Sequence, residues 1–406
     1  MQNDLPLSGI KVLELAAVLA GPSVGMFFAE LGAKVIKVEN VTTQGDVTRN
    51  WKLPKETADT DISGYFSCVN WGKASFAADL CKPEGLQLIY NLAGHCDIVL
   101  VNYKPGDAEK LKVDYPTLKK FNEKLIYSHI TGYGLKNRRA GFDAIIQAES
   151  GFTYMNGEQG GPPIKMPVAL MDLLAAHQVK EAILLALIHR ERTGKGQFIE
   201  ASLFRAGISS LANQASNWLV GQTIPQRMGS DHPNIVPYGT IFHTADQKGI
   251  VVAAGTDKQY RELVKALGRP ELAEDPRFAR NQDRVVHKAE INGIIQDCIG
   301  KYKREEILQI LEEKRIPAGG VFNMKEVFEA PESEGMILKG QYPSGMAIKG
   351  VRSVAFSTND PMTVEQLSPP PHYGQHTRQI LRELLGFAET QIDNLINKGV
   401  VYARKD

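Results

Sequence analysis

The stretch Pro167–Arg205, PVALMDLLAAHQVKEAILLALIHRERTGKGQFIEASLFR, decides how the chain folds. It opens with a short apolar run, Pro167–Met171, that is typical of the end of a strand. Apolar residues then recur at helical spacing, and Gly194 marks the end of the helix. Gln197–Leu203 is a further strand candidate. The stretch therefore predicts a strand end, a long helix and another strand.

A single carboxylate, Asp172, follows the first apolar run at once and lies where the strand is expected to become a helix. Free backbone N–H groups and the positive end of the helix dipole favour its ionised form there. An aspartate in this position either caps the helix or attacks an electrophile. Its position alone does not decide between the two roles.

Length and composition indicate an ordinary globular enzyme. At 406 residues the chain is long enough for two domains rather than one. Its hydrophobic content of 43% and charged content of 23% are typical of soluble proteins. The net charge of +1 gives no bulk field that would recruit nucleic acid or an anionic membrane. No stretch approaches the roughly 18–20 apolar residues of a membrane span.

The first residues and the cysteines suggest a compartment. The polar start MQNDLPLSG contains an aspartate and is unlike a signal peptide. The four cysteines are scattered and form neither a CxxC pair nor a zinc-binding pattern. We therefore expect a cytoplasmic protein with reduced thiols and no metal site.

The N-terminal patterns predict an α/β fold. Ile10–Leu15, Ser23–Leu31 and Ala33–Glu39 are typical of a strand, a helix and a strand, which suits a parallel sheet covered by helices. The turn at Gly21 lacks the GxGxxG pattern of dinucleotide-binding proteins. Later, the chain is expected to be helical over Ala206–Val220. We predict a smaller α+β domain over residues 225–333, inserted between residues 1–224 and 334–406.

A loop after a buried strand is a candidate for phosphate binding. The pattern Asp97–Asn102 predicts the strand, and ligands of open α/β sheets bind at the carboxyl ends of strands. Lys104 and Lys110 lie near this end and could meet phosphates. The chain contains no GxSxG, HExxH or Walker pattern. The residue patterns alone therefore indicate an enzyme-like α/β protein with one notable aspartate.

Several short stretches, spread over nearly the whole chain, resemble a known family when they are taken together. They are LSGIKVLELAAVLAGP (Leu7–Pro22), LGAKVIKVE (Leu31–Glu39), QGDVTR (Gln44–Arg49), NYKPG (Asn102–Gly106), GYG (Gly132–Gly134), AGFDAIIQAESG (Ala140–Gly151), PVALMD (Pro167–Asp172), RTGKGQFIEASL (Arg192–Leu203), HPNIVPYG (His232–Gly239) and GQHTRQIL (Gly374–Leu381). In this order they resemble the class III CoA-transferase family, which also contains the α-methylacyl-CoA racemases.

The resemblance implies a fold and an assembly. The fold would be a Rossmann-like α/β large domain built from both chain ends, together with the smaller α+β domain. In this family two subunits are threaded through each other as interlocked rings. We therefore expect an interlocked homodimer.

The resemblance also implies an activity, because Asp172 stands at the family's nucleophile position. Its carboxylate would attack an acyl-CoA thioester to give an aspartyl–acyl anhydride and CoA thiolate. The thiolate would return to form an aspartyl-CoA thioester, from which CoA passes to an acceptor carboxylate. Water must be kept from the anhydride, and the irregular segments Thr153–Lys165 and Gly221–Pro237 are candidates for the cover. No metal, redox group or other tightly bound cofactor is implied, and CoA is a substrate.

The resemblance implies a set of CoA contacts as well. They are Val18, Leu19, Ala20, Lys73, Asn102, Tyr103, Lys104, Lys110, Leu111, Gly132 and Tyr133. Lys110 stands where the family usually has arginine, so a phosphate contact would remain but with less directional geometry.

Three departures from the family's patterns bear on the reaction. Racemases pair the aspartate with a histidine that corresponds to Phe142, and phenylalanine cannot transfer a proton. His129 and His177 are nearby in sequence, but we expect both to be structural. Leu19 and Asn40 stand where formyl-CoA:oxalate enzymes have glutamine and arginine, which disfavours oxalate as acceptor. A transferase is thus favoured over a racemase or a non-catalytic acyl-CoA-binding protein, and the acceptor acid stays open.

Overall fold

The computed structural model describes residues 5–57 and 60–405, which divide into two compact units. The large unit contains residues up to 150, residues 166–216 and residues from 335 onward. The small unit contains residues 151–165 and 217–334. Residues 151–165, which the sequence patterns assigned to the large domain, are thus grouped with the small unit.

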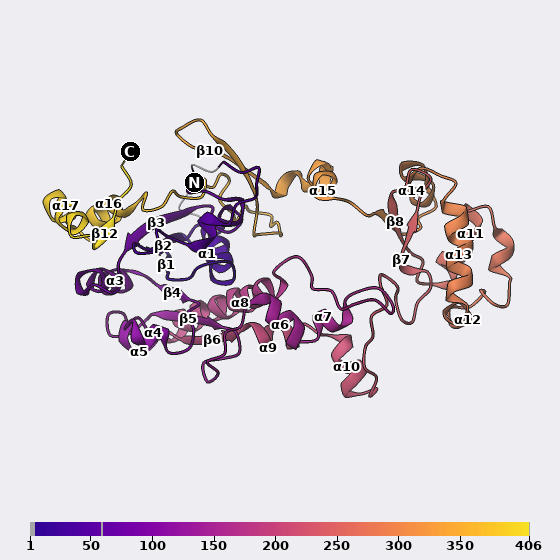
Figure 1. The fold of residues 1–406 in the computed structure, drawn as a ribbon, viewed down its shortest axis with the longest axis horizontal. Helices are drawn as coiled ribbons and strands as arrows, with labels where there is room; N and C mark the ends of the chain where they lie inside the picture. The colour runs from indigo at the N-terminus through magenta and orange to yellow at the C-terminus, as the bar shows by residue number, and fades with distance from the viewer. Residues whose placement is uncertain (1–4, 58–59, 406) are drawn as a thin grey trace. The chain divides into compact units, whose positions relative to one another are not determined.

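A seven-stranded sheet forms the centre of the large unit (Figure 1). Its strand order is β12-β3-β2-β1-β4-β5-β6, and every neighbouring pair is parallel except β12 with β3. The strands are β1 Lys11–Glu14, β2 Lys34–Asn40, β3 Lys73–Ala78, β4 Ile98–Val101, β5 Ile126–Thr131, β6 Phe198–Ser202 and β12 Val401–Tyr402. The mixed α/β class with a mostly parallel sheet is therefore confirmed.

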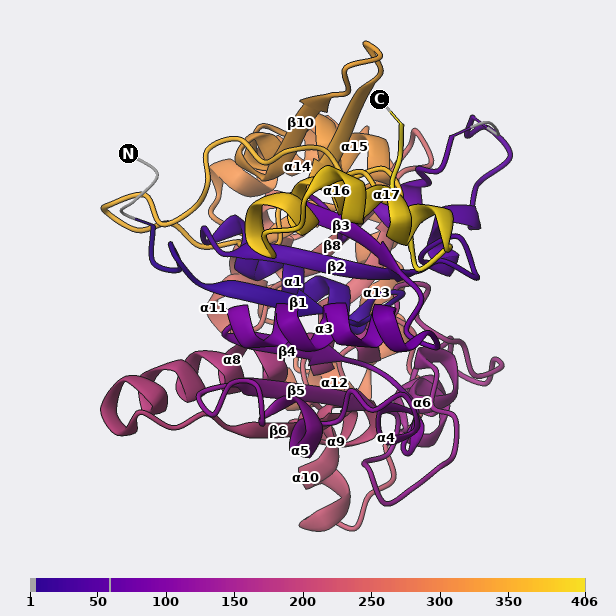
Figure 2. The ribbon, with the colours of Figure 1, turned by 90° about the vertical axis from the view of Figure 1, so that its left-hand side faces the viewer.

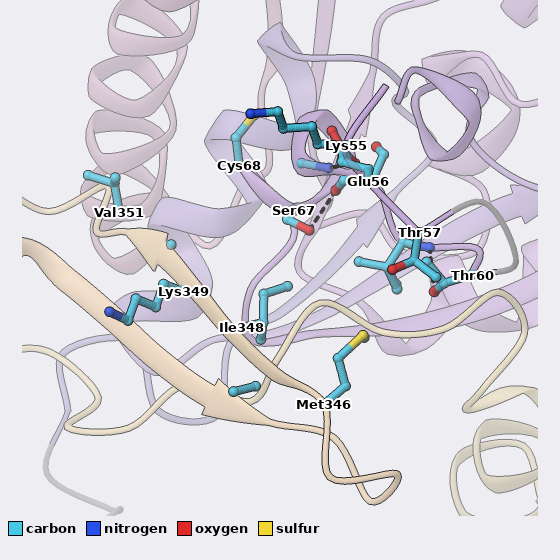
Figure 3. A pocket seen from close by; sticks show the side chains of 15 residues that line it. Lys55, Glu56, Thr57, Thr60, Ser67, Cys68, Met346, Ile348, Lys349 and Val351 are labelled. Carbon is cyan, nitrogen blue, oxygen red and sulfur yellow. Dashed lines mark hydrogen bonds between the residues drawn. The ribbon is translucent and has the colours of Figure 1, made fainter. Parts of the chain in front are cut away.

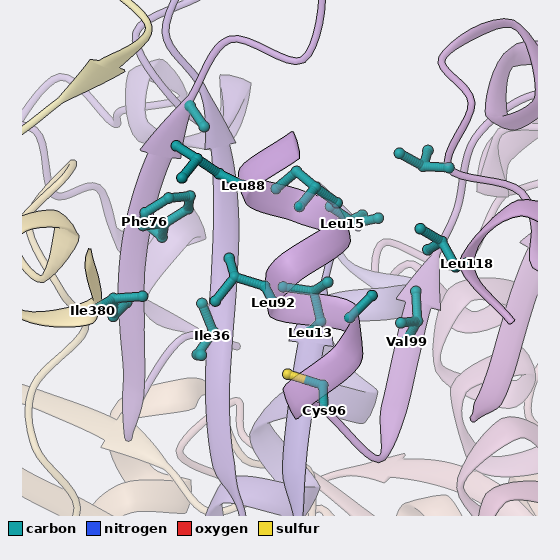
Figure 4. Close-up of a cluster of buried hydrophobic side chains, with 14 of the residues drawn as sticks. Leu13, Leu15, Ile36, Phe76, Leu88, Leu92, Cys96, Val99, Leu118 and Ile380 are labelled. Atoms are coloured by element: carbon teal, nitrogen blue, oxygen red, sulfur yellow. The ribbon is translucent and has the colours of Figure 1, made fainter. Parts of the chain in front are cut away.

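Helices pack against this sheet. Helix α1, Ala20–Glu30, contacts β1 to β4 and α8, while α8, Leu170–Thr193, also contacts β5 and β6. Figure 2 shows α3, Pro83–His95, lying in front of β1 and β4. In Figure 4, Leu88 and Leu92 of α3 lie among Leu13, Ile36, Phe76 and Val99 from the strands. This apolar layer fixes the strand ends that carry the site.

Shorter elements complete the large unit. They are α2 Gly64–Ser67, α4 Asp107–Lys110, α5 Tyr115–Leu118, α6 Asp143–Glu149, α9 Leu203–Ser209, α16 Thr377–Gln379, α17 Glu389–Asn397, a short 3-10 helix Val47–Asn50, a π-helical turn Ile380–Leu384 and the hairpin of β10 Ile337–Gln341 with β11 Ala347–Val351.

The small unit has a core of its own. An antiparallel sheet of β7, β8 and β9 packs against helices through Phe242, Ile250 and Val252. The elements of this unit are α7 Phe152–Met155, β7 Tyr238–His243, β8 Gly249–Ala253, α11 Asp257–Ala266, α12 Asn281–Val286, α13 Lys288–Ile299, α14 Arg304–Glu313, β9 Ala318–Gly320 and α15 Met324–Glu329, with two short 3-10 helices, Pro270–Ala273 and Pro331–Met336. Helix α10, Asn213–Leu219, spans the boundary between the units.

Two predicted elements are wrong. Pro167–Met171 does not end a strand, because α8 already begins at Leu170 and the first apolar residues join its helical period. Ala206–Val220 is not one helix but two, with Ala212 in a left-handed conformation at φ 50° between them. The side chains of Ser209 and Ser210 both donate to the Ala206 carbonyl, which competes with continued helix formation.

The predicted end of α8 is confirmed. Gly194 adopts a left-handed conformation, φ 71°, and its N–H group donates to the Arg190 carbonyl. Glycine takes such a conformation without the steric penalty that a Cβ atom brings. The chain can therefore turn back at once into β6.

Candidate active site

Three adjoining cavities lie along the carboxyl ends of the parallel strands. We call them the reacting, middle and outer cavities, and their volumes are about 360, 380 and 750 Å³. Asp172 lines the reacting cavity, Asp46 the middle cavity and Lys110 the outer cavity. Tyr103 lines all three, so the cavities meet at this residue. An elongated ligand could therefore run from Asp172 to Lys110.

The cavities coincide with the switch point of the sheet. Strand β1 lies between β2 and β4. After β1 the chain adds β2 and β3 on one side of it, and then β4, β5 and β6 on the other side. Ligands of open α/β sheets bind at such a point. Ala17 and Asn102, which follow β1 and β4, are joined there by two hydrogen bonds. The Ala17 N–H group donates to Asn102 Oδ1 at 3.0 Å, and Asn102 Nδ2 donates to the Ala17 carbonyl at 2.7 Å.

Asp172 lies in the first turn of α8, but it does not cap the helix. That role belongs to Asp143, whose Oδ1 atom accepts from the Met171 N–H group at 2.8 Å. Gln147 Nε2 donates to the other oxygen of Asp143, also at 2.8 Å. Within residues 5–57 and 60–405, the Asp172 carboxylate has no hydrogen-bond or ion-pair partner. Its oxygens are therefore available to a substrate.

The expected ionised state of Asp172 needs a correction. Burial, and then the negative charge of Asp143, raise the pKa of Asp172 to about 7. Both effects oppose the helix dipole, which had favoured the charged form. Both carboxylates line the reacting cavity, and a pKa near this value leaves Asp172 only partly ionised near neutral pH.

This arrangement predicts how activity depends on pH. The variant Asp143→Asn keeps an oxygen for the Met171 N–H group but loses the charge, so the pKa of Asp172 should fall. We expect the acid limb of kcat/KM, near pH 7 in the wild type, to move down by about one unit. The control Asp114→Asn alters a helix cap on α5 instead and should leave the profile in place. If the acid limb of Asp143→Asn did not move, the acid limb could not be attributed to an Asp172 carboxyl whose pKa is raised by Asp143.

Most of the predicted CoA contacts are brought together. The reacting cavity is lined by Val18, Leu19, Ala20, Asn102, Tyr103, Lys104 and Gly132, and the outer cavity by Tyr103, Lys110 and Leu111. Tyr133 is not in the lining, and its hydroxyl group donates to Glu149 Oε2 at 2.7 Å.

Lys73 is placed away from the cavities. It is 3% exposed, and its ammonium group pairs with Glu14 at 2.8 Å. It also donates to the Pro22 carbonyl and to Asn70 Oδ1. Because its donors are all used within the protein, the structure gives no support to Lys73 as a CoA contact. Lys73 instead forms a buried ion pair with Glu14.

The residues considered for racemisation do not form a second acid/base group at the cavity. Phe142 lines the cavity at the start of α6 and is 68% exposed. His129 is buried, and its Nε2 atom bonds to the Tyr103 carbonyl at 2.9 Å. His177 lies on the exposed part of α8. Thus His129 supports the loop that carries Tyr103, as expected of a structural histidine.

Sequence reasoning missed several residues of the site. Asp143 stands beside Phe142 in the segment Ala140–Gly151, and the sequence patterns gave it no role. Arg139 lines the reacting cavity and pairs with Glu149. Burial, and then the charge of Asp172, raise the pKa of Tyr65 to about 12, which places its phenol within electrostatic reach of the Asp172 carboxylate. No periodicity or spacing in the sequence pointed to Tyr65.

A fourth cavity, of about 480 Å³, lies between residues 55–57 and 60–68 on one side and β11 on the other (Figure 3). Its two lysines, Lys55 and Lys349, come from these two segments. None of the predicted site residues lines it.

The chain belongs to CoA-transferase family III, whose model matches residues 7–377. It is thus a class III CoA-transferase, an enzyme that transfers CoA between acids. It is 40% identical to the succinate–glutarate CoA-transferase of Agrobacterium fabrum, over 93% of this chain and 96% of that protein. It is 35% identical to human succinyl-CoA:glutarate CoA-transferase, over 99% of this chain and 91% of that protein.

A solved structure supports the same family assignment. The crystal structure of a CAIB/BAIF family protein from Brucella suis matches with a TM-score of 0.84 and 38% identity. The match covers 94% of this chain and 99% of that one. In the part of the chain that the structure describes, no helix combines the length and apolarity needed to cross a bilayer.

Proposed function

We propose that this enzyme transfers CoA from succinyl-CoA to glutarate or a similar short dicarboxylic acid. The named activities of the two relatives support this choice of donor and acceptor. The reacting cavity offers matching chemistry, since Lys104 and Arg139 line it together with Asp172. A cation beside the nucleophile can hold the second carboxylate of a dicarboxylic acid, which a monocarboxylic acid lacks.

The first half of the proposed reaction loads CoA onto the enzyme. The ionised Asp172 carboxylate attacks the thioester carbonyl of succinyl-CoA, and the C–S bond breaks to give a succinyl–aspartyl anhydride and CoA thiolate. The thiolate then attacks the aspartyl carbonyl of the anhydride. Succinate leaves, and Asp172 holds CoA as a thioester.

The second half repeats these steps in reverse order for the acceptor. One carboxylate of glutarate attacks the aspartyl-CoA carbonyl and displaces CoA thiolate, forming a glutaryl–aspartyl anhydride. The thiolate attacks the glutaryl carbonyl, which gives glutaryl-CoA and regenerates the Asp172 carboxylate. Every intermediate is an activated acyl group, so the energy of the thioester is kept as long as water is excluded.

The observation that carries this proposal is the unpaired carboxylate of Asp172 in the reacting cavity, at one end of the three adjoining cavities. A purely structural aspartate at a helix start would accept hydrogen bonds from the first turn, and here Asp143 does so instead. The raised pKa of Asp172 is compatible with a nucleophile that is ionised in a useful fraction of molecules near neutral pH.

The substrate is tested by transfer assays with succinyl-CoA and a panel of acids. We expect glutarate to outperform acetate and oxalate, because neither can place a distant second carboxylate near Lys104 or Arg139. A separate incubation of a 2-methylacyl-CoA with the enzyme in D2O, without an acceptor acid, tests racemisation. Deuterium at the α-carbon of a 2-methylacyl-CoA would favour a racemase, and binding of CoA esters without turnover on any acid would favour a binding protein.

The nucleotide end of CoA is proposed to lie in the outer cavity, where Lys110 is exposed. Lys110→Ala should weaken CoA binding about 3- to 10-fold, as expected for one exposed phosphate contact. Lys110→Arg should bind at least as tightly as the wild type, because guanidinium can hold a phosphate through two hydrogen bonds. Calorimetric titration with CoA measures both. Equal affinities for Lys110→Ala and the surface control Lys120→Ala would contradict the placement.

The interlocked homodimer remains part of the proposal. Apolar side chains on α8 and α9 support it, because Leu185, Ile188 and Ile208 are 67%, 50% and 47% exposed. Such residues commonly mark a surface that a partner covers. Light scattering should give the mass of a dimer, and a monomer at micromolar concentration would contradict this expectation.

A further inference from the structure

The loop after β1 is held by three side chains from other parts of the large unit. Lys37 donates to the Ala16 carbonyl at 2.9 Å, and Asn102 bonds to both main-chain groups of Ala17. The Val18 N–H group points to Asp46, at 3.2 Å from one carboxylate oxygen and 3.4 Å from the other. Three successive residues therefore have their main chain fixed by side chains that are distant in sequence.

Val18 adopts an unfavourable backbone conformation in this arrangement. Its φ angle is 68°, in the left-handed region. A β-branched residue rarely adopts this region, because its side chain collides with its own backbone. Such strain persists only where the surroundings enforce it. Val18, Leu19 and Ala20 line the reacting cavity, so the strained residue forms part of the wall beside Asp172.

Asp46 is the group that faces the strained residue, and it is itself firmly held. It is 5% exposed, and it pairs with Lys37, which is 1% exposed, at 2.9 Å. Its own N–H group donates to Glu39 at 2.9 Å, and Thr48 donates to Asp46 Oδ1 through its N–H and hydroxyl groups. Burial raises the pKa of Asp46, but the charge of Lys37 and the hydrogen bonds from Lys37 and Thr48 together outweigh burial and lower this pKa to about 2. The carboxylate is thus charged throughout the working range.

We propose that Asp46 is a positioning residue for CoA transfer, which holds Val18 in its left-handed conformation and so fixes the wall of the reacting cavity. This inference rests on the proposed function, since it assumes that an acyl-CoA reacts with Asp172 in that cavity. Asp46 touches neither the nucleophile nor the thioester in this scheme. It acts through the main chain of Val18.

The expected consequence is a loss of rate rather than of binding. The nucleotide end of CoA is proposed to lie in the outer cavity, which Val18 does not line, so we expect CoA to keep most of its affinity when Val18 shifts. The attack on the thioester depends strongly on placement, because a displacement of about 1 Å can cost on the order of 100-fold in rate. Releasing Val18 from Asp46 should therefore slow acylation more than it weakens binding.

The test measures single-turnover acylation of Asp172 by succinyl-CoA, followed by acid quench and intact mass spectrometry. Asp46→Ala should acylate about 10- to 100-fold more slowly than the wild type, with the affinity for CoA changed less than about threefold. Asp46→Asn keeps an oxygen for the Val18 N–H group and should give an intermediate rate. If Asp46→Ala does not fold, Asp46→Asn replaces it as the background for the Val18→Gly comparison described next.

The second substitution, Val18→Gly, separates positioning from general stability. Glycine adopts a positive φ without steric cost. In the wild-type background Val18→Gly should slow acylation, because it removes a side chain from the cavity wall. In the Asp46→Ala background it should instead accelerate acylation about 3- to 10-fold, because the loop no longer needs to be held. A merely structural role for Asp46 predicts no such change of sign.

Glu30→Gln serves as the matched control. Glu30 is a fully buried carboxylate at the other end of α1, where it accepts hydrogen bonds from the Ser353 and Val354 N–H groups. This variant should lose stability but acylate at the wild-type rate. An acylated wild type with an equally fast Asp46→Ala, or a Val18→Gly that slows both backgrounds alike, would overturn the inference. A wild type that is never acylated would overturn the proposed function instead.

Discussion

Asp172→Ala is expected to lose CoA transfer by roughly three orders of magnitude or more, because the proposed mechanism forms both anhydrides and the enzyme-bound thioester on this carboxylate. Affinity for CoA should change little. Asp172 lines the reacting cavity, whereas Lys110, which is proposed to hold the nucleotide end of CoA, lines the outer cavity. Initial rates of glutaryl-CoA formation and calorimetric titration with CoA measure the two properties separately.

A control on the same helix tests whether any loss of a carboxylate from α8 lowers the activity. Glu181 is exposed on α8, and Glu181→Gln should keep the wild-type rate. The folding of Asp172→Ala can be checked by its thermal midpoint. That midpoint should not fall at pH 8, because burial and Asp143 already disfavour the charged carboxylate. An Asp172→Ala enzyme that keeps most of its activity would eliminate the covalent mechanism.

Lys73→Met is expected to reduce the free energy of unfolding by about 3–5 kcal/mol, the usual result of leaving one partner of a buried ion pair alone. Glu14 would keep only the longer contact to Lys37, at 3.2 Å, and both carboxylate oxygens lie in the protein interior. Because a domain is commonly stable by only 5–15 kcal/mol, a loss of this size is readily measured. Urea unfolding at pH 7 gives the value.

The same variant separates the two interpretations of Lys73. If Lys73 stabilises the fold, CoA affinity in the folded Lys73→Met protein should be close to that of the wild type. If Lys73 contacts CoA, as the family resemblance implied, affinity should fall while stability stays unchanged. Lys110→Met provides the comparison, because Lys110 is exposed at the outer cavity and should show the second pattern.

Local patterns predicted the elements that depend on local physics. The helical spacing of α8 and its glycine end were readable, since neighbouring residues determine both. The strand after Asp97 was readable as well, because β4 is buried on both faces and therefore continuously apolar. The apolar run before Asp172 was misread because a short apolar segment fits a strand and a buried helix start equally well.

The site depended on contacts that no local pattern encodes. Asp143 and Met171 are 28 residues apart, and their hydrogen bond frees Asp172 from capping the helix. Asp46 and Val18 are also 28 residues apart, and Ala17 and Asn102 are 85 apart. Most residues that the family resemblance implied as CoA contacts line the cavities. The resemblance could not show that the Lys73 side chain turns inward to Glu14, because the direction of a side chain depends on packing.

The covalent role of Asp172 can be tested most directly by intact mass spectrometry after the enzyme is mixed with succinyl-CoA and then with hydroxylamine. Hydroxylamine attacks an activated aspartyl carbonyl and leaves a stable hydroxamate. We predict one hydroxamate per chain, located by peptide mapping at Asp172 and absent from Asp172→Ala. An unmodified chain that still forms glutaryl-CoA, or a hydroxamate on another carboxylate, would contradict the account.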